Sequence, residues 1–454
     1  MAQNQSQFGI LEASIILSSV KNEDKVVDVR GNIVEVNLFE NLYKPYVDST
    51  IVLIDDFGLK NSLNIQGTER LKLVLGDAEN PEEPVVVKYF FFSKINDTQK
   101  MNERSELLSI SLVEEHVYID AIKQFSKSYT DELENIITSI ADNELGKTVV
   151  KSLFEPSVQG PRKIIVPYLS PLEAIQWLRD RATTRTGSPI FLSGSLYTNS
   201  LVMSSLDGLL REDVINDKLP LRYSSAISGV DADQDQLRPY YEIMSFKEVD
   251  AENSLALYEN GAIGSFYASI DAGTGVLAGD HISVRDILDE FYTNKLISAD
   301  TNQSVFDPSL EIDGKLSDEY NSLHIHQVVS SNTYNQFKSY HDETSLLGEN
   351  NSLIESRLKA KNKIIRTFLK KNIIDIGMNG SLFFKGRISV GRKLRLLFLN
   401  SNVQGDLKDT NDQIDKRKSG DYIILATNHR LADEKHTTIL RLTKLGELPK
   451  DFRV

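Results

Sequence analysis

The chain of 454 residues contains no cysteine, and this absence removes several classes of protein at once. Disulfide scaffolds, thiolate metal sites and cysteine nucleophiles all need the missing side chain. The absence also fits folding in a reducing cytosol, although it does not determine the compartment. Tryptophan is nearly absent too, and the single residue, Trp177, is expected to pack in a core rather than bind a ligand.

Long apolar runs are also missing. No window approaches the roughly 18 uninterrupted apolar residues that a transmembrane helix needs. The first residues carry no basic segment, and Glu12 and Ser14 interrupt their apolar run, so they do not form a signal peptide. We therefore expect a soluble protein that does not use a membrane.

Signatures of catalysis are scarce. The sequence has no GxSxG nucleophile elbow, no HExxH zinc motif and no GxxxxGK[ST] phosphate loop. With 65 carboxylates, any acid pair chosen by eye would be a chance pairing. We therefore predict no enzyme, no catalytic residue and no cofactor.

Histidines are the remaining candidate metal ligands. His324 and His326 would share one face of a strand, but no third histidine lies near them, so a structural or surface pair is favoured over a metal site. His429 and His436 are expected to face each other across the last hairpin. No metal site is predicted.

The composition is that of a large, folded and acidic protein. Apolar residues make up 40% and charged residues 26%, which is typical of globular chains, and the length suggests roughly three domains. The formal net charge of −14 repels phosphate backbones, so nucleic-acid binding would need a local basic patch. The strongest basic run, 416–418, favours a solvated loop tip, with an acidic partner as the alternative.

The amino-terminal part has the alternation of β-strands. Within the central stretch, 43–76, leucines alternate with other residues over 71–75, which predicts a strand with one buried face. Residues 85–95 are apolar at successive positions and are expected to form a strand covered on both faces. We expect about six antiparallel strands over 10–117, in a small barrel or sandwich.

Helical periodicity follows. Apolar residues over 133–140 predict a helix that ends at Gly146, and the capping box at 170–173 opens a second helix. Asp207-Gly208 indicates a hairpin-type turn. A basic amphipathic helix is expected over 353–369, after which β patterns return and close with a hairpin.

Two short motifs carry a more specific signal. The first is a Pro-Tyr approach, an apolar strand into an Asp-rich turn, and I-x-G-x-E opening the next strand; the second is S-G-x-Y-x-I-x-x-x-x-H in the last β region. Together with the order of the segments, they resemble the baseplate hub proteins of contractile, myovirus-type tails, a family related to the amino-terminal half of the type VI secretion spike protein. The matching structural residues are Pro45, Tyr46, Asp55, Gly58, Gly67, Glu69, Gly391, Gly420, Tyr422 and His429.

The resemblance implies a β-rich α+β fold in which two similar antiparallel β-barrel tube domains flank α+β and small β insertions. It implies a first tube barrel at 8–118, completed by a returning segment near 235–250, and an α+β domain at 119–234. A small β-rich insertion domain at 251–345 and a helix with the second tube barrel at 346–454 follow.

The implied function is structural and non-enzymatic, in the baseplate of a phage virion. The resemblance implies a homotrimer whose pseudo-sixfold ring adapts the sixfold tail tube to a threefold central spike and forms part of the channel for DNA during genome ejection. Partners would be further copies of the chain, a separate spike protein and a tail tube or tube-initiator protein, then baseplate wedge and tape-measure proteins. DNA would pass without specific binding, and assembly would occur in the host cytoplasm.

Two other classes of function stay open. One is a β-rich adhesin or fibre-attachment protein, which glycan or cell binding would support. The other is a metal-dependent hydrolase using His324 and His326, which would need stoichiometric metal.

Overall fold

The computed structural model describes the parts of the chain that form helices, strands and their shorter connections. The described residues are 8–17, 25–56, 58, 69–77, 80–101, 105–156, 162–223, 241–249, 254–271, 277–297, 311–329, 349–371, 373–380, 386–398, 414–415, 418–433 and 435–444.

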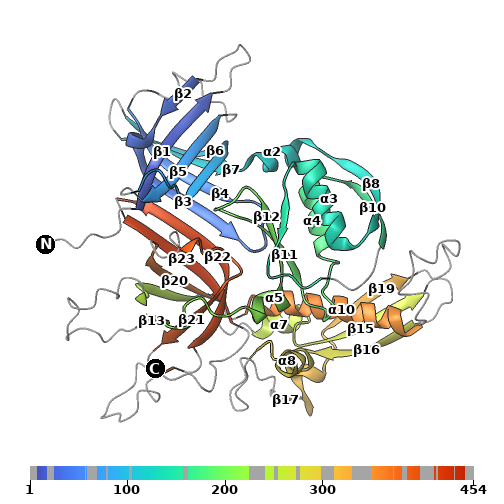
Figure 1. Cartoon of the computed structure of the whole chain (residues 1–454). Helices are drawn as coiled ribbons and strands as arrows, with labels where there is room; N and C mark the ends of the chain where they lie inside the picture. The colour runs from blue at the N-terminus through green and yellow to red at the C-terminus, as the bar shows by residue number, and fades with distance from the viewer. Residues whose placement is uncertain are drawn as a thin grey trace, which may run out of the picture.

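A single 13-stranded sheet unites strands from both ends of the sequence, coloured blue and red in Figure 1. Its N-terminal half has the order β3-β4-β7-β6-β5-β1-β2, and every neighbouring pair is antiparallel. These strands are β1 (Phe8–Leu17), β2 (Lys25–Asp28), β3 (Ile33–Asn41), β4 (Asp48–Asp55), β5 (Arg70–Asp77), β6 (Val86–Lys100) and β7 (Glu106–Val113), with a 3-10 turn, η1 (Arg30–Asn32), before β3.

The C-terminal half continues the same sheet in the order β14-β20-β23-β22, and β22 then pairs with β3. The strand β21 also pairs with β22, and β13 lies parallel to β21. The bounds are β13 (Leu221–Tyr223), β14 (Ser245–Val249), β20 (Ile373–Asn379), β21 (Lys393–Phe398), β22 (Gly420–Ala432) and β23 (Lys435–Thr443). The β22–β23 hairpin confirms the expected closing hairpin.

The β-rich α+β class is therefore confirmed, but the sheet is open. Among the described strands its path ends at β14 on one side and at β2 on the other. The returning segment near 235–250, expected to complete the first barrel, needs a correction. Its described strand, β14, pairs with β20 in the C-terminal half of the sheet, and the register places Phe246 opposite Ile376.

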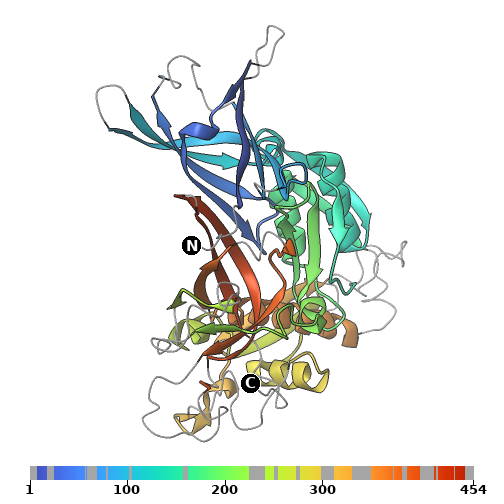
Figure 2. The ribbon, with the colours of Figure 1, turned by 60° about the vertical axis from the view of Figure 1, so that its left-hand side comes forward.

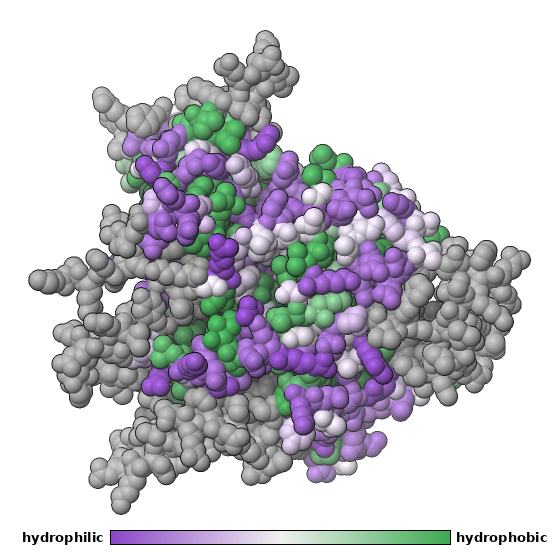
Figure 3. Space-filling model, viewed as in Figure 1, coloured by the Kyte–Doolittle hydropathy of each residue, from purple (hydrophilic) through white to green (hydrophobic). Residues whose placement is uncertain are grey.

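Side-chain burial follows the expected period in β5 and departs from it in β6. Leu71, Leu73 and Leu75 are fully buried, as their alternation predicted. The expectation of two covered faces for β6 was wrong, because Val87 and Tyr89 are 48% and 51% exposed. Among the described residues these two side chains lie at the surface, and hydrophobic residues gather on the surface over the N-terminal half (Figure 3).

Helices and two small sheets fill the first segment between the two halves of the sheet. It contains α2 (Glu115–Ile122), β8 (Phe125–Asp131), α3 (Leu133–Leu145), β9 (Val149–Lys151), β10 (Arg162–Leu169), α4 (Pro171–Arg179), β11 (Ile190–Gly194), β12 (Leu201–Ser205) and α5 (Leu206–Arg211). The strands β8 and β10 pair with each other, and β11, β12 and β9 form a second small sheet.

Two local helix signals acted as expected, and one turn signal did not. The helix α3 ends at Gly146, whose φ of 65° suits glycine, and Ser170 and Glu173 form the reciprocal capping box of α4. Asp207-Gly208 is not a turn but lies in α5, which Ser205 caps. Glycine is required there because a Cβ on Gly208 would overlap the Leu153 carbonyl.

The second insertion packs against a long helix. It contains α7 (Ser254–Glu259), β15 (Gly264–Asp271), β16 (Leu277–Ser283), α8 (Val284–Thr293), β17 (Glu311–Ile312), β18 (Lys315–Leu316), the 3-10 turn η2 (Ser317–Glu319) and β19 (Leu323–Val329), followed by α10 (Glu349–Phe368). The helix α10 contacts β15, β16 and β19, which form one sheet. It confirms the basic amphipathic helix expected from the sequence.

Three hydrophobic cores result from this arrangement. One lies inside the N-terminal half of the sheet, around Leu38, Ile51 and Phe90. A second lies under α3 and α4, where Trp177 packs at the edge as expected. The third joins the C-terminal half of the sheet to α8 and α10.

The close approach at Gly208 gives a test of the fold. We expect Gly208→Ala to lower the free energy of unfolding by about 1–3 kcal/mol, although alanine favours helices, because the new methyl group collides with the Leu153 carbonyl. Chemical denaturation measures the change. Gly31→Ala is the control, since open space surrounds Gly31, and an equal loss in both variants would contradict the account.

Candidate functional site: a buried polar junction

The Pro-Tyr motif lies where the N-terminal sheet meets the helical segment. Pro45 and Tyr46 belong to the connection between β3 and β4, and the Pro45 carbonyl oxygen lies 2.8 Å from His116 Nε2 on α2. On the other side, a Cβ on Gly194 at the end of β11 would lie 2.6 Å from the Tyr46 carbonyl carbon. The Gly194 N–H donates to the Lys44 carbonyl oxygen at 3.0 Å. The motif is thus enclosed by α2 and β11.

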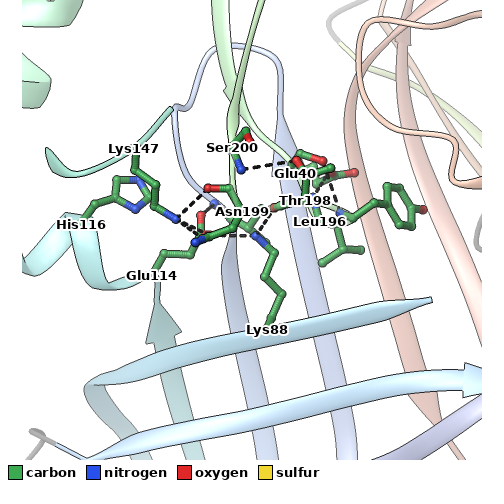
Figure 4. A network of polar contacts seen from close by, with 12 residues as sticks. Glu40, Lys88, Glu114, His116, Lys147, Leu196, Thr198, Asn199 and Ser200 are labelled. Carbon is green, nitrogen blue, oxygen red and sulfur yellow. Dashed lines mark hydrogen bonds and ion pairs between the residues drawn. The ribbon is translucent and has the colours of Figure 1, made fainter. Parts of the chain in front are cut away.

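Glu114 is the charged centre of this region. Its Oε2 accepts from the backbone N–H of Val47 at 2.8 Å, and its Oε1 lies 2.8 Å from Lys88 Nζ and 3.5 Å from Lys147 Nζ (Figure 4). The side chains of Glu114 and Lys88 are each only 5% exposed. Burial by itself would raise the pKa of Glu114, but the two lysines keep it below its ordinary value.

The turn between β11 and β12 completes this network. Lys88 Nζ donates to the Thr198 carbonyl oxygen at 2.9 Å, and Lys147 Nζ donates to both oxygens of Asn199. Burial lowers the pKa of Lys147, and Glu114 opposes that shift. The network joins β6, α2, the start of β9 and this turn, so the positions of four segments depend on one cluster of charges.

A second buried carboxylate, Glu40 on β3, lies at the edge of the same region. It accepts from the Leu196 N–H at 2.7 Å, from Ser389 Oγ at 2.9 Å and from Thr427 Oγ1 at 3.3 Å. Leu196 belongs to the β11–β12 turn, Ser389 to the segment before β21, and Thr427 to β22. Burial raises the pKa of Glu40 to about 7. One side chain therefore bonds to both halves of the sheet and to the segment between them.

The C-terminal motif residues lie in and around β22, and Gly391 follows Ser389, the donor to Glu40, by two positions. Gly391 has a φ of 84°, and its N–H donates to the Ile424 carbonyl oxygen at 2.8 Å. The buried Tyr422 hydroxyl donates to the Lys418 carbonyl oxygen at 2.6 Å. At Gly420, where β22 begins, φ is 147°. These contacts shape the turn that leads into the strand.

The expected approach of two histidines is confirmed. His429 and His436 have ring centroids 5.6 Å apart, and His429 Nδ1 lies 2.9 Å from Thr438 Oγ1. Burial lowers the pKa of His429 to about 3 and that of His436 to about 2, with His429 adding to the second shift. Both rings are therefore neutral at physiological pH and act as packed side chains.

The other residues of the first motif lie away from the junction. Asp55 is buried at the end of β4, Gly58 has a φ of 66°, and the Glu69 carbonyl oxygen accepts from the Phe92 N–H at 2.9 Å. Gly67 lies outside the described residues. The structure thus places Pro45, Tyr46 and Gly391 around the junction and leaves Asp55, Gly58 and Glu69 near the far end of β4 and β5.

The candidate metal ligands do not form a site in the described residues. His324 is exposed on β19 and lies 5.4 Å from the Phe266 ring, while the His326 side chain lies outside the described residues. No group of three His, Cys, Asp or Glu suited to a metal occurs in the part of the chain that the structure describes. Its helices also include none long and apolar enough to cross a membrane.

The basic run 416–418 lies only partly within the described residues. Lys418 forms an ion pair of 3.1 Å with Glu248 on β14, and the other two residues lie outside. An acidic partner within the same chain therefore accounts for the described member of the run.

Sequence reasoning missed the charged members of the junction, but a signal was available. In the two-residue alternation of β3, Glu40 is the next inward-facing position after Val36 and Leu38. On β6, Lys88 is the inward-facing position between Val86 and Phe90. A charged residue in phase with a buried apolar row is expected to find a partner, because an unpaired buried charge is costly.

The comparison with solved structures gives the fold. A tail protein from Neisseria meningitidis MC58 matches with a TM-score of 0.50 at 12% identity, covering 96% of this chain and 97% of that one. The 43 kDa tail protein of prophage MuSo2 from Shewanella oneidensis matches with a TM-score of 0.49 at 10% identity, covering 95% and 97%.

A third similar structure comes from secretion. The E. coli c3393 protein, described as a type VI secretion component similar to the T4 bacteriophage tail proteins gp27 and gp5, matches with a TM-score of 0.41 at 7% identity, covering 93% of this chain and 75% of that one. No protein-family model and no curated protein sequence matches this chain. At the level of fold, the expected resemblance to tail proteins is confirmed by the Neisseria structure.

Glu114 provides a first test of the junction. We expect Glu114→Gln to lower the free energy of unfolding by about 3–5 kcal/mol, because Lys88 and Lys147 would remain buried without their counter-charge. Chemical denaturation measures this loss. Glu155→Gln, which breaks the exposed pair with Arg211, is the matched control and should cost about 1 kcal/mol or less. Equal losses would contradict the account.

Glu40 predicts a specific pH dependence. Its folded pKa of about 7 lies above the ordinary value of 4.5, so the folded state binds this proton more tightly and loses stability as pH rises through that interval. Relative to Glu40→Gln, the wild type should lose about 2–3 kcal/mol between pH 5 and pH 8. Denaturation of both proteins across this range measures the difference, and parallel curves would rule the assignment out.

Proposed function

We propose that this chain is the structural hub at the centre of a contractile phage tail baseplate. The observation that carries the proposal is the fold, which it shares over 96% of its length with a tail protein of nearly equal extent. Strands from both ends of the sequence pair in one sheet, which suits a protein whose role is to hold other proteins in a fixed arrangement. On this proposal the chain has no catalytic role.

The open sheet supports an assembly of several copies. Among the described strands, β2, β14 and β13 end the sheet, and strand edges tend to pair with another chain unless something covers them. A closed ring removes such edges, and cyclic symmetry is the common way for identical chains to close. We therefore propose a homotrimer in which each chain contributes two tube domains, for a pseudo-sixfold ring.

The proposed division of the chain follows this logic. Residues 8–118 form the first tube domain and 346–454 a helix with the second, while 119–234 and 251–345 form the insertions. In the ring, the tube domains match the sixfold tail tube on one side and a threefold central spike on the other. The channel passes DNA during genome ejection.

The proposed partners follow from this position. They are two further copies of the chain, a separate spike protein and a tail tube or tube-initiator protein, with wedge and tape-measure proteins around them. The location is the tail baseplate of the virion, reached by assembly in the host cytoplasm.

The solution mass tests the proposal. The chain has a mass of 51.1 kDa, and we expect light scattering to give three times that value, for the chain alone or after addition of its spike protein. A ring with threefold symmetry and six similar lobes should appear in negative stain. A monomer that persists at micromolar concentration with the spike present would contradict the proposal.

A further inference from the structure

One exposed face of the large sheet continues across the join between its two halves. The register places Asp375 of β20 opposite Arg441 of β23, Arg441 opposite Ala426 of β22, and Ala426 opposite Asn41 of β3. Directly opposed residues point to the same side of a sheet. This side is the one turned away from the cores, because Ile376, Leu440 and Leu38 fill the other. Figure 2 shows these strands side by side, in red and blue.

Both arginines on this face are held in ion pairs across neighbouring strands. Arg441 bonds Asp375 through two contacts of 2.9 Å, from Nε to Oδ1 and from Nη2 to Oδ2. Arg430 Nη2 bonds Glu35 Oε2 on β3 at 2.7 Å. The sequences of β20, β23, β22, β3, β4 and β7 contain no other arginine and only one lysine, Lys435, at the tip of the hairpin.

Ion pairing favours the charged forms of Glu35, Arg430 and Arg441. The hydrogen bond from Arg430 is the main reason why the pKa of Glu35 is lowered. The bonds to Glu35 and Asp375 raise the pKa of Arg430 and Arg441, respectively. The arginines are nonetheless 47% and 49% exposed, so without their acids they would face solvent as free cations.

Uncharged residues occupy most of the remaining positions on the face. In register next to the pairs lie Asn37, Thr50 and Ser111, on β3, β4 and β7. Asn37 Nδ2 donates to the second carboxylate oxygen of Glu35 at 2.6 Å, which fixes that acid in place. The face is thus nearly neutral, although the chain as a whole carries a formal charge of −14.

We propose that this face, across β20, β23, β22, β3, β4 and β7, is a wall turned toward a polyanion that must move past it, on which Asp375 and Glu35 keep the two arginines from binding phosphate. The Asp375 carboxylate occupies two donors of Arg441 that a phosphate would use, and Glu35 occupies one donor of Arg430. Each arginine freed from its acid would add one phosphate contact and one released counterion. The inference rests on the proposed DNA channel and names the surface of the chain that lines it.

The test uses the purified full chain and a short DNA duplex of random sequence, at low salt. The double variant Glu35→Gln/Asp375→Asn frees both arginines, and we expect it to bind the duplex at least ~10-fold more tightly than wild type, with affinity falling with salt at a slope of about −1.8. The wild type should stay below the detection limit, so the ~10-fold gain is a lower bound set by that limit. Adding Arg430→Gln and Arg441→Gln to the double variant should abolish the binding again.

A matched control separates local from overall charge. Glu82→Gln/Glu311→Gln removes the same two negative charges from exposed positions outside this face, before β6 and in β17, and should bind no DNA. Binding by the wild type, equal binding by the control, or no gain in the double variant would each overturn the proposal. Folding of every variant is checked by circular dichroism. Light scattering on the same samples gives the oligomeric state of each variant, so a failure of this proposal is distinct from a failure of the trimer.

Discussion

The pairing of β3 with β22 is the constraint on which the rest of the structure depends. Seven consecutive residue pairs, from Asn41 with Ala426 to Glu35 with Ala432, join strands from opposite ends of the chain. Everything between must return the chain to this line, so the two insertions extend to one side of the sheet (Figure 1). Glu40, on the core side of the same line, bonds to Leu196, Ser389 and Thr427, and Glu114 anchors the helical segment nearby. Strand pairing determines the register of the two halves, and these buried carboxylates determine how the insertion meets them.

The two faces of the join have different physical tasks. On the buried side, the carboxylates of Glu40 and Glu114 are removed from water and accept several hydrogen bonds instead. Removing one of these partners would be costly. On the exposed side, the ion pairs of Arg430 and Arg441 contribute little to stability, since solvent screens them. Their effect is to neutralise cations at the surface. Such a combination, a rigid join with a nearly neutral outer face, suits a wall whose shape must persist while something charged passes it.

Much of this fold was predictable from local sequence, and the reasons for the failures are physical. Periodicity and caps identified α3, α4 and the β5 strand because burial and capping act over a few residues. The successive apolar residues of β6 were misleading, since they cannot reveal that Val87 and Tyr89 are left exposed among the described residues. Asp207-Gly208 was misleading because glycine there allows a close approach to Leu153, which is distant in sequence.

The pairing partner of β14 and the roles of Glu40 and Lys88 depend on contacts between remote segments. For the same reason the junction was not predicted, although its charged residues in apolar rows were visible.

A three-dimensional reconstruction of the assembled particle by electron microscopy tests the central claim most directly. The account predicts threefold symmetry, with the N-terminal and C-terminal halves of each sheet alternating around one channel as six similar units, and with Arg430 and Arg441 facing that channel. A particle in which only one half of the sheet borders the channel, or one without threefold symmetry, would contradict it.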